Sequence, residues 1–332
     1  MTVDDTRSGL QQALDALTGA AQSQEAPAVI AAPSASAKGI GSIEGIGTIG
    51  GIESVDTEPV SEAPTVRLSG PVNESWLELW YQPKIDLRQK CLAGAEALAR
   101  IRHPEHGVLS PDSYVSSADE DSLARLFERA ILTTLSDWSA FGDAGFNLRL
   151  AINVPVQLLF KSPLPKLVRE NCPKSELWPG LIVEVTEDQF VRDAKCAREI
   201  AAELRANGIA IAIDDFGAGY SSFATMRELA FAELKIAKTF VASCAADATK
   251  SAICQTAVDL AHRFGSTAVA GGIDNVADLQ ALQILECDFG QGTLLAPPMT
   301  KERFIELLQR RLNKGPAPQA SLAEPSATRL SA

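Results

Sequence analysis

The chain has 332 residues, of which 46% are hydrophobic and 22% are charged, a composition typical of soluble globular proteins. It carries 30 Lys and Arg residues against 42 Asp and Glu residues, a net charge of −12 that disfavours nucleic-acid polymers and anionic membranes as partners. An anionic small ligand would need a local cluster of basic side chains or metal ions to overcome repulsion by this negative charge.

The cysteines and the N-terminus indicate the compartment. The six cysteines form no Cys-x-x-Cys pair, and together with the three histidines they match no zinc-site spacing. The first residues lack the apolar core of a signal peptide, and no run of about 18 apolar residues predicts a membrane span. We therefore predict a cytoplasmic protein with reduced thiols and no membrane insertion.

Residues 1–70 differ in composition from the rest, and we predict a low-complexity, mostly disordered tail. Leucines at i, i+4 and i+7 predict one short amphipathic helix within residues 8–22. Within residues 39–53 an isoleucine recurs at every third position, a period that fits neither a strand nor an α-helix. Two interpretations stay open, a disordered linker and a partner-binding element, because five isoleucines are unusual in a solvated linker.

Strand and helix patterns alternate between residues 74 and 313, which we interpret as one domain. The predicted strands are short and apolar, and they lie at 76–86, 91–99, 148–153, 181–185, 209–214, 233–236, 267–271 and 287–290. The predicted helices lie at 121–140, 155–171, 188–207, 221–229, 247–264, 275–285 and 301–313. This pattern predicts an α/β fold, a TIM-type (β/α)8 barrel, with a doubly wound open sheet as the alternative. Residues 314–332 are rich in Pro, Ala and Ser, and they predict a second disordered tail.

Polar side chains stand at or near the ends of several predicted strands. They are Glu96, Asn153, Glu184, Asp214, Asp215 and Lys235, and Gln291 follows the last strand. A single acidic residue after a strand is most often a helix cap. Here five strands end in polar residues, and in a barrel these ends would meet on the face where barrel enzymes carry out chemistry. Crowded carboxylates raise one another's pKa unless a cation lies among them, and such oxygen-rich clusters suit Mg²⁺ or Mn²⁺.

The same segments resemble the EAL domain family of bacterial cyclic di-GMP phosphodiesterases. Glu96-Ala97-Leu98 resembles the signature that gives the family its name. The other matching motifs occur in the expected order: Tyr81-Gln82-Pro83-Lys84-Ile85-Asp86, Arg100-Ile-Arg102-His103-Pro104, Leu109-Ser110-Pro111, Glu184-Val-Thr-Glu187, Asp214-Asp215-Phe216-Gly217-Ala218-Gly219-Tyr220-Ser221-Ser222, Leu234-Lys235-Ile236 and Gln291-Gly292. The resemblance covers about residues 74–312. A kinase interpretation of Asp215-Phe216-Gly217 lacks every companion motif.

The resemblance implies a barrel whose first strand runs antiparallel to the others. It also implies cleavage of cyclic di-GMP at one phosphodiester by two metal ions that clamp the phosphate. The implied ligands of the first ion are Glu96, Asn153, Glu184 and Asp214, with Asp214 bridging to a second ion held by Asp215.

The remaining implied roles concern the nucleotide and the attacking water. Lys235 would orient the water or stabilise charge on the phosphate, and Gln291 would lie near the metal-bound water. Glu187 would anchor the loop 217–222. The implied ligand contacts are Arg100 to a phosphate and Gln82 and Pro297 to guanine, with Asp215, Lys235 and Gln291 nearby.

Two positions depart from the family pattern. The family has Lys-Ile-Asp where this chain has Lys235-Ile236-Ala237, and Ala-Glu-Gly-Val-Glu where it has Ala270-Gly271-Gly272-Ile273-Asp274. Asp274 stands at the outer Glu of the pattern and does not replace the lost inner one. Both losses fall around the second ion, so we expect one Mg²⁺ or Mn²⁺ site to persist and the second to be weakened.

We therefore predict a degenerate EAL-domain protein that binds cyclic di-GMP as a sensor or effector, with little or no hydrolysis, and regulates an unidentified protein partner, for example in motility or biofilm control. Two alternatives stay open. One is an active metal-dependent phosphodiesterase that gives linear pGpG, which the intact first-ion residues favour. The other is a protein-interaction module that no longer binds nucleotide. The amphipathic helix 301–313 would either cover the barrel or serve a homodimer.

Overall fold

The computed structural model describes residues 73–115, 119–155, 158–159, 163–173, 176–186, 194–217, 226 and 230–313, without the side chains of Asp112 and of residues 194–197 and 311–313. The predicted tails at 1–70 and 314–332 and the predicted helix at 8–22 lie outside these residues. Most of the predicted helix at 221–229 also lies outside them.

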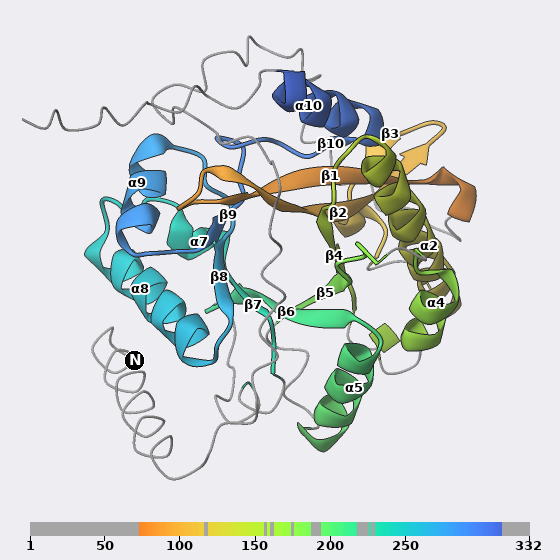
Figure 1. The fold of residues 1–332 in the computed structure, drawn as a ribbon, viewed down its shortest axis with the longest axis horizontal. Helices are drawn as coiled ribbons and strands as arrows, with labels where there is room; N and C mark the ends of the chain where they lie inside the picture. The colour runs from red at the N-terminus through yellow and green to blue at the C-terminus, as the bar shows by residue number, and fades with distance from the viewer. Residues whose placement is uncertain are drawn as a thin grey trace, which may run out of the picture.

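Eight strands close into a barrel (Figure 1). In chain order they are β1 (Leu77–Asp86), β2 (Cys91–His103), β4 (Arg149–Asn153), β5 (Leu181–Thr186), β6 (Ile209–Phe216), β7 (Glu233–Ile236), β8 (Thr267–Ala270) and β9 (Phe289–Gly290). β1 closes the barrel because it pairs antiparallel with both β2 and β9, whereas the pairs from β2 through β9 are parallel. The predicted barrel with an antiparallel first strand is confirmed, and the open-sheet alternative is wrong.

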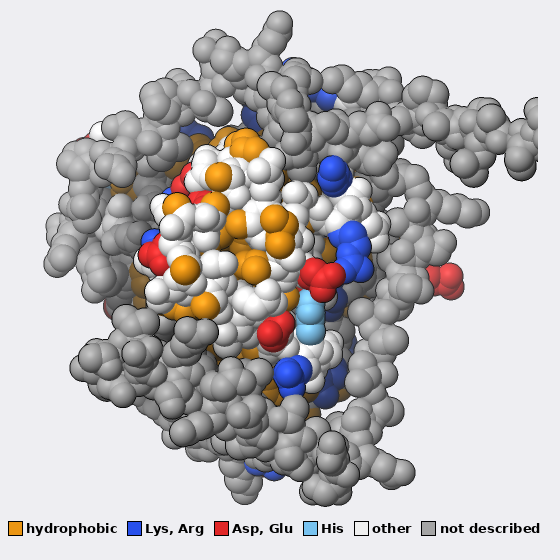
Figure 2. Space-filling view, turned by 90° about the vertical axis from the view of Figure 1, so that its left-hand side faces the viewer, with side chains coloured by type: hydrophobic (Ala, Val, Ile, Leu, Met, Phe, Trp, Pro, Cys, Tyr) orange, Lys and Arg blue, Asp and Glu red, His pale blue; other side chains and the backbone are white. Residues whose placement is uncertain are grey.

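Helices surround the barrel (Figure 1). They are α2 (Glu120–Asp143), α4 (Leu164–Asn171), α5 (Ala194–Ala206), α7 (Lys238–Val241), α8 (Ala248–Arg263), α9 (Val276–Ile284) and α10 (Lys301–Asn313). Apolar side chains gather in the middle of the side that α8 and α9 form (Figure 2). A search of the described residues finds no helix with the length and apolar character of a membrane span.

Several short elements were not predicted, because two to four residues carry too little periodicity to be recognised. They are the strands β3 (Gly107–Leu109) and β10 (Met299–Thr300), the helix α7 and the 3-10 turns η1 (Glu74–Trp76) and η2 (Pro111–Ser113). β3 folds back on β2, which explains why β2 runs beyond its predicted end at residue 99. The last predicted strand is shorter than expected and begins at Phe289.

The barrel interior has an apolar layer between two charged layers. Ala151, Ile182 and Ala212 form the apolar layer on three neighbouring strands. Side chains alternate along a strand, so the residues two positions further toward the carboxyl ends also face inward, and these are polar. At the opposite end Lys84 Nζ lies 2.5 and 2.6 Å from the two carboxylate oxygens of Glu233, and both side chains are buried. The register of the strands therefore fixes the position of the charged groups along the barrel axis.

Helix α10 is joined to the barrel by a buried polar contact. The hydroxyl of Tyr81 donates a 2.5 Å hydrogen bond to Asp137 on α2, and Lys301 Nζ lies 2.7 Å from the other oxygen of that carboxylate. Burial and the charge of Asp137 raise the pKa of Tyr81 well above its usual value. The Tyr81 ring also stacks on Phe304 of α10, with 5.7 Å between ring centroids. The predicted role of this helix as cover for the barrel agrees with these contacts.

We expect Asp137→Ala to lower the free energy of unfolding by about 1–3 kcal/mol, because it leaves the buried Tyr81 hydroxyl without its acceptor. Glu306→Ala on α10 removes an exposed ion pair with Arg303 and should cost about 0–1 kcal/mol. Urea unfolding of both variants measures the difference. Equal losses in the two variants would show that the contact does not stabilise the fold.

Candidate functional site

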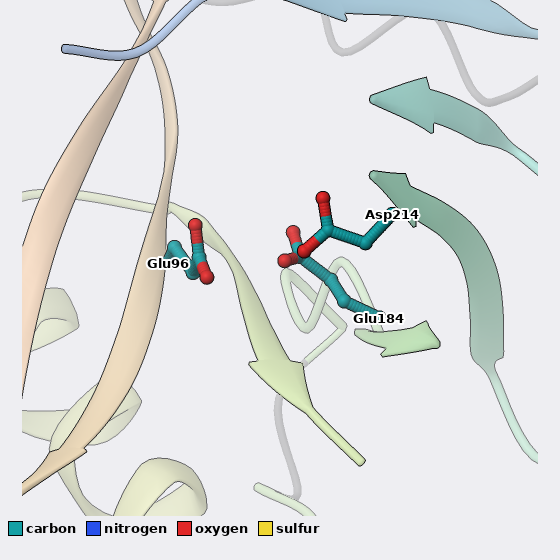
Figure 3. Close-up of side chains that lie close together, drawn as sticks. All are labelled: Glu96, Glu184 and Asp214. Carbon is teal, nitrogen blue, oxygen red and sulfur yellow. The ribbon is translucent and has the colours of Figure 1, made fainter. Parts of the chain in front are cut away.

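Three carboxylates from three barrel strands meet at one end of the barrel, which we call the mouth (Figure 3). Glu96 comes from β2, Glu184 from β5 and Asp214 from β6. One oxygen from each lies within 4.8 Å of the others, a spacing at which a single metal ion could be held. Glu96 and Glu184 are buried, and Asp214 is partly exposed.

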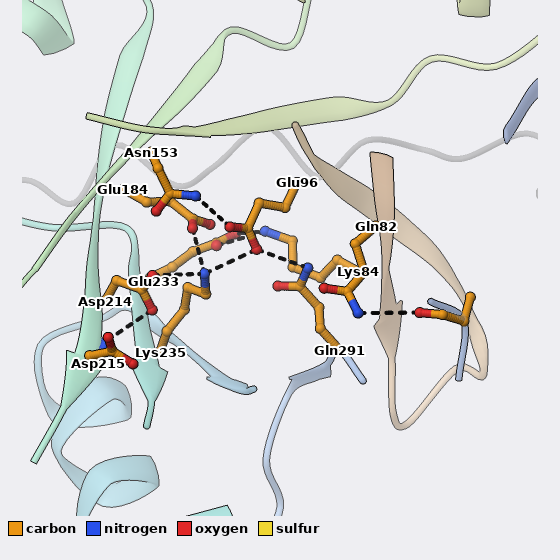
Figure 4. A network of polar contacts seen from close by, with 11 residues as sticks. Gln82, Lys84, Glu96, Asn153, Glu184, Asp214, Asp215, Glu233, Lys235 and Gln291 are labelled. Carbon is orange, nitrogen blue, oxygen red and sulfur yellow. Dashed lines mark hydrogen bonds and ion pairs between the residues drawn. The ribbon is translucent and has the colours of Figure 1, made fainter. Parts of the chain in front are cut away.

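A lysine ammonium lies among these carboxylates (Figure 4). Lys235 Nζ is 3.2 Å from Glu96 Oε2 and 3.1 Å from Asp214 Oδ2, and it also contacts Glu184 Oε2. The side chain of Lys235 is only 7% exposed, so water screens these interactions weakly. Lys235 is therefore the internal counter-ion of the cluster.

The pKa values of the cluster follow from burial and charge. Burial would lower the pKa of Lys235, but the charges of Glu184, Glu96 and Asp214 raise it well above its usual value. Burial and the charge of Glu96 raise the pKa of Glu184 well above its usual value, against the opposing effect of Lys235. One ammonium faces three carboxyl groups, so the ionised cluster has an excess of negative charge. Oxygen donors with excess negative charge are suitable ligands for a hard divalent cation.

Two amides orient Glu96. Asn153 Nδ2 donates a 2.6 Å hydrogen bond to Glu96 Oε1, and Gln291 Nε2 donates a 3.3 Å hydrogen bond to Glu96 Oε2. Burial alone would raise the pKa of Glu96, but the charge of Lys235 and the Asn153 hydrogen bond lower it below its usual value. Both oxygens of Glu96 are thus fixed in position, and the carboxyl group remains ionised.

An irregularity in β6 separates two neighbouring aspartates. The register between β6 and β7 shifts between Ile213 and Phe216, and Asp215 has a left-handed backbone with φ of 54°. Bulges of this kind redirect side chains, and they are common beside functional sites. The Asp215 amide donates a 2.8 Å hydrogen bond to Asp214 Oδ1. As a result Asp214 joins the cluster of Glu96 and Glu184, while Asp215 lies at the solvent-exposed edge. Partial desolvation and the charge of Asp214 raise the pKa of Asp215.

The predicted nucleotide-binding residues lie around the same mouth. Gln82 on β1 is opposite Glu96 in the register of the β1–β2 pair, and its amide donates a 3.3 Å hydrogen bond to the carbonyl of Ala296. Pro297 follows directly. The Arg100 guanidinium on β2 lies 5.7 Å from the ring centroid of Trp80. The predicted residue Glu187 and most of the loop 217–222 lie outside the described residues.

The loops that follow β7 and β8 form a rim of the barrel mouth beside Lys235. This rim has no carboxylate at the two positions where the family pattern has one. Gly271 and Ala237 are the residues there. Asp274, further along the same loop, is 2.9 Å from Lys238 Nζ and accepts a 2.8 Å hydrogen bond from Thr293. These contacts hold the Asp274 carboxyl at the outer side of the rim and lower its pKa. The Asp274 carboxylate therefore already has Lys238 and Thr293 as partners.

Sequence reasoning missed the buried pair of Lys84 and Glu233, and it did not foresee that Lys235 contacts all three carboxylates. A signal for the pair was present, because each is a charged residue within a predicted strand. Their pairing depends on β1 and β7 facing each other across the barrel, which the sequence pattern does not specify.

Comparison with known proteins identifies the family. Residues 66–298 match the EAL domain, so the chain belongs to this family. A curated relative, the cyclic di-GMP phosphodiesterase PA2567 of Pseudomonas aeruginosa, is 34% identical over 242 residues, which cover 71% of this chain and 41% of that protein. The chain thus spans about two fifths of the length of this relative.

Solved structures agree with this assignment. The phosphodiesterase PaMucR in complex with c-di-GMP is 33% identical, with a TM-score of 0.63, and the match covers 69% of this chain and 94% of that one. The EAL enzyme Bd1971, bound to cAMP and cyclic di-GMP, is 27% identical, with a TM-score of 0.64, and the match covers 70% of this chain and 65% of that one. The EAL barrel therefore occurs in proteins that bind this nucleotide.

The role of Lys235 predicts a pH dependence of stability. In Lys235→Met the cluster loses its counter-ion, so the folded-state pKa of Glu184 rises further above its value in the unfolded chain, and the pKa of Glu96 is no longer lowered by Lys235. Stability is then retained at low pH, where the groups are protonated in both states, and it falls as the pH rises through the raised folded-state values. We expect the loss relative to the parent to reach roughly 3 kcal/mol at neutral pH.

Urea unfolding at several pH values between about 4 and 8 measures this loss. Lys238→Met is the matched control, because Lys238 is 65% exposed and its removal should cost about 0–1 kcal/mol at every pH. A loss for Lys235→Met that does not grow with pH would contradict the counter-ion role.

Proposed function

We propose that this chain binds cyclic di-GMP at the mouth of its barrel, hydrolyses it slowly or not at all, and acts as a sensor or effector that regulates a protein partner. The observation that carries the proposal is the loss of two rim carboxylates, at Gly271 and Ala237, beside a complete cluster of Glu96, Glu184 and Asp214. The relatives that bind or cleave this nucleotide support the choice of ligand.

The buried cluster suits one divalent ion. Glu96, Glu184 and Asp214 supply carboxylate oxygens, Asn153 supplies an amide, and we propose these four residues as ligands of Mg²⁺ or Mn²⁺. A bound ion would neutralise the excess negative charge and lower the pKa of a coordinated water. Lys235 would then be free to orient that water or to contact a phosphate oxygen. Gln291, which is bonded to Glu96, would lie beside the same water.

A second ion is poorly supported on the other side of the mouth. Asp215 would be its principal ligand, but the neighbouring positions Ala237 and Gly271 offer no oxygen-bearing side chain. Two-ion hydrolysis needs both ions, because one stabilises the attacking oxygen and the other the leaving oxygen. Loss of ligands on one side therefore weakens catalysis more than it weakens binding.

Binding depends on groups that this chain retains. We propose that Arg100 contacts a phosphate of the ligand and that Gln82 and Pro297 lie against guanine. The Arg100 guanidinium above Trp80 offers a planar donor set that suits a phosphate. The hydrogen bond from Gln82 to the carbonyl of Ala296, the residue before Pro297, supports a shared contact with one base. Glu187 is proposed to anchor the loop 217–222, and this loop is proposed to report occupancy of the site to the partner.

An active phosphodiesterase that gives linear pGpG is the second candidate, and the complete cluster around Lys235 favours it. The two candidates differ in a single assay. The full chain is titrated with cyclic di-GMP in the presence of Mg²⁺ or Mn²⁺, and the nucleotide is then analysed by chromatography. We expect saturable binding and intact ligand. Rapid conversion to linear product would refute the sensor proposal, and absence of binding would leave only a protein-interaction role.

The same titration tests Arg100. Arg100→Ala should weaken binding by about 10- to 150-fold, equivalent to about 1.5–3 kcal/mol, because a charged hydrogen bond to phosphate is lost. Arg102→Ala is the matched control, since Arg102 lies two residues further along β2 and pairs with Glu78 at 2.8 Å. Equal affinities for the two variants would exclude the proposed phosphate contact.

Restoring the lost carboxylates tests the explanation of weak hydrolysis. A Cβ at Gly271 would have only an ordinary contact, 3.4 Å to the carbonyl oxygen of Ile236, so Gly271→Glu fits the structure. Ala237 is the buried N-cap of α7, and Asp is a favoured residue at an N-cap, so Ala237→Asp is the matching change. The double variant should raise the rate of hydrolysis by about 10²-fold or more, the effect of one general base or charge-stabilising group.

The matched control has the same shape without charge, Gly271→Gln with Ala237→Asn, and it should remain as slow as the parent. Chromatography of the product measures both rates. If the carboxylate variant binds the nucleotide but stays as slow as this control, the missing carboxylates do not explain the low activity.

A further inference from the structure

Helix α9 has an unusual surface for a helix on the outside of a barrel. Its single charged side chain, Asp278, is buried and faces inward. The Asp278 carboxylate accepts hydrogen bonds of 2.8 and 2.9 Å from the backbone amides of Ser243 and Ala245. The outward side of α9 instead exposes Val276 by 45% and Ile284 by 81%. A helix with exposed apolar side chains and no charged residue on its outer side is typical of a surface that another segment covers.

The exposed surface continues beyond the helix. The turn held by Asp278 exposes Ala245 and Ala246, next to the first turn of α9. We call the following residues the α9 face: Ala245, Ala246, Val276, Ala277, Gln280 and Ile284, all of them exposed and uncharged. Val276, Gln280 and Ile284 are four residues apart, so they form one stripe along the helix. Figure 2 shows apolar atoms gathered in the middle of this side and charged ones nearer its edge.

The chain itself contains a segment with matching chemistry that the proposed function does not use. Residues 39–53 carry five isoleucines at every third position, two glutamates and no basic residue. In a conformation with three residues per turn, such as polyproline II, all five isoleucines would point to one side. An apolar stripe of this kind is stabilised only where an uncharged surface covers it.

The chain between residues 39–53 and the first described residue is long enough for this segment to reach α9. Nineteen residues, 54–72, separate the segment from Asn73. Fully extended they reach about 60 Å, and a flexible chain of this length averages about 25 Å. Asn73 precedes β1, and the other end of β1 lies beside α9, where Gln283 Nε2 donates a 3.1 Å hydrogen bond to the carbonyl of Leu87. The required span is therefore about the length of β1, roughly 34 Å for ten residues.

We propose that the α9 face is the docking surface for residues 39–53 of the same chain. The isoleucine stripe covers Val276 and Ile284, and the small side chains of Ala245, Ala246 and Ala277 allow the glycine-rich backbone to approach closely. α9 begins directly after Asp274 and Asn275, so the docked segment borders the rim of the barrel mouth on the side of Gly271. The inference does not depend on nucleotide binding.

Hydrogen exchange on the full chain tests the proposal. The variant is Ile284→Ser combined with Val276→Ser. The control is Leu177→Ser, since Leu177 is a 69% exposed apolar residue that does not belong to the α9 face. We expect the amides of residues 39–53 to exchange about tenfold faster in the variant than in the parent and the control. Equal exchange rates of residues 39–53 in all three proteins, whether fast or slow, would overturn the proposal. They would show that the α9 face does not protect these amides.

Two further measurements distinguish docking within the chain from unfolding of the variant and from contact with a second copy. Ile284→Ser alone changes a residue that is 81% exposed, so its fold should persist, and it should show part of the same acceleration. The exchange of residues 39–53 in the parent should be unchanged on dilution, as contact within one chain requires. Protection that disappears on dilution would mean that a second copy supplies the contact, and it would overturn docking within the chain.

Discussion

The arrangement at the barrel mouth depends on one interaction, the contact of the Lys235 ammonium with three carboxylates from three other strands. Charged groups inside a protein are costly unless each has a partner of opposite sign. The fold meets this requirement twice, since Lys84 and Glu233 form a second buried pair at the opposite end of the barrel. Between the two layers lie small or β-branched side chains, so strands bearing charged groups can pack closely. The oxygen cluster is thereby assembled before any ligand arrives.

The same charge balance is compatible with the proposed ligand site in a barrel that lacks two rim carboxylates. The proposed ligands of the first ion lie on strands whose register is fixed by the barrel, and Lys235 offsets part of their charge. Gly271 and Ala237 lie in the connections after strands β8 and β7, outside the paired part of the barrel. Lys238, Asp274 and Thr293 hold this rim together by contacts among themselves. The rim is thus held together by contacts that do not include the oxygen cluster of Glu96, Glu184 and Asp214.

Much of the fold could be predicted because its strands are short apolar runs ending in polar residues, as at Leu181–Thr186. That polar strand ends would lie together followed from the geometry of parallel strands, and Glu96, Glu184 and Asp214 do meet. The antiparallel first strand came from the family resemblance, since periodicity does not set strand direction. The Lys84–Glu233 pair and the bulge at Asp215 were beyond prediction, because they depend on register between distant strands. The roles of individual site residues remain predictions.

The central claim is that one divalent ion and an intact nucleotide occupy the mouth together. Anomalous diffraction from crystals grown with Mn²⁺ and cyclic di-GMP tests it most directly, because it counts the ions and shows the ligand in the same map. The account predicts a single manganese peak between Glu96, Glu184 and Asp214, beside uncleaved nucleotide. Two fully occupied peaks bridged by Asp214, with linear product in the site, would contradict it.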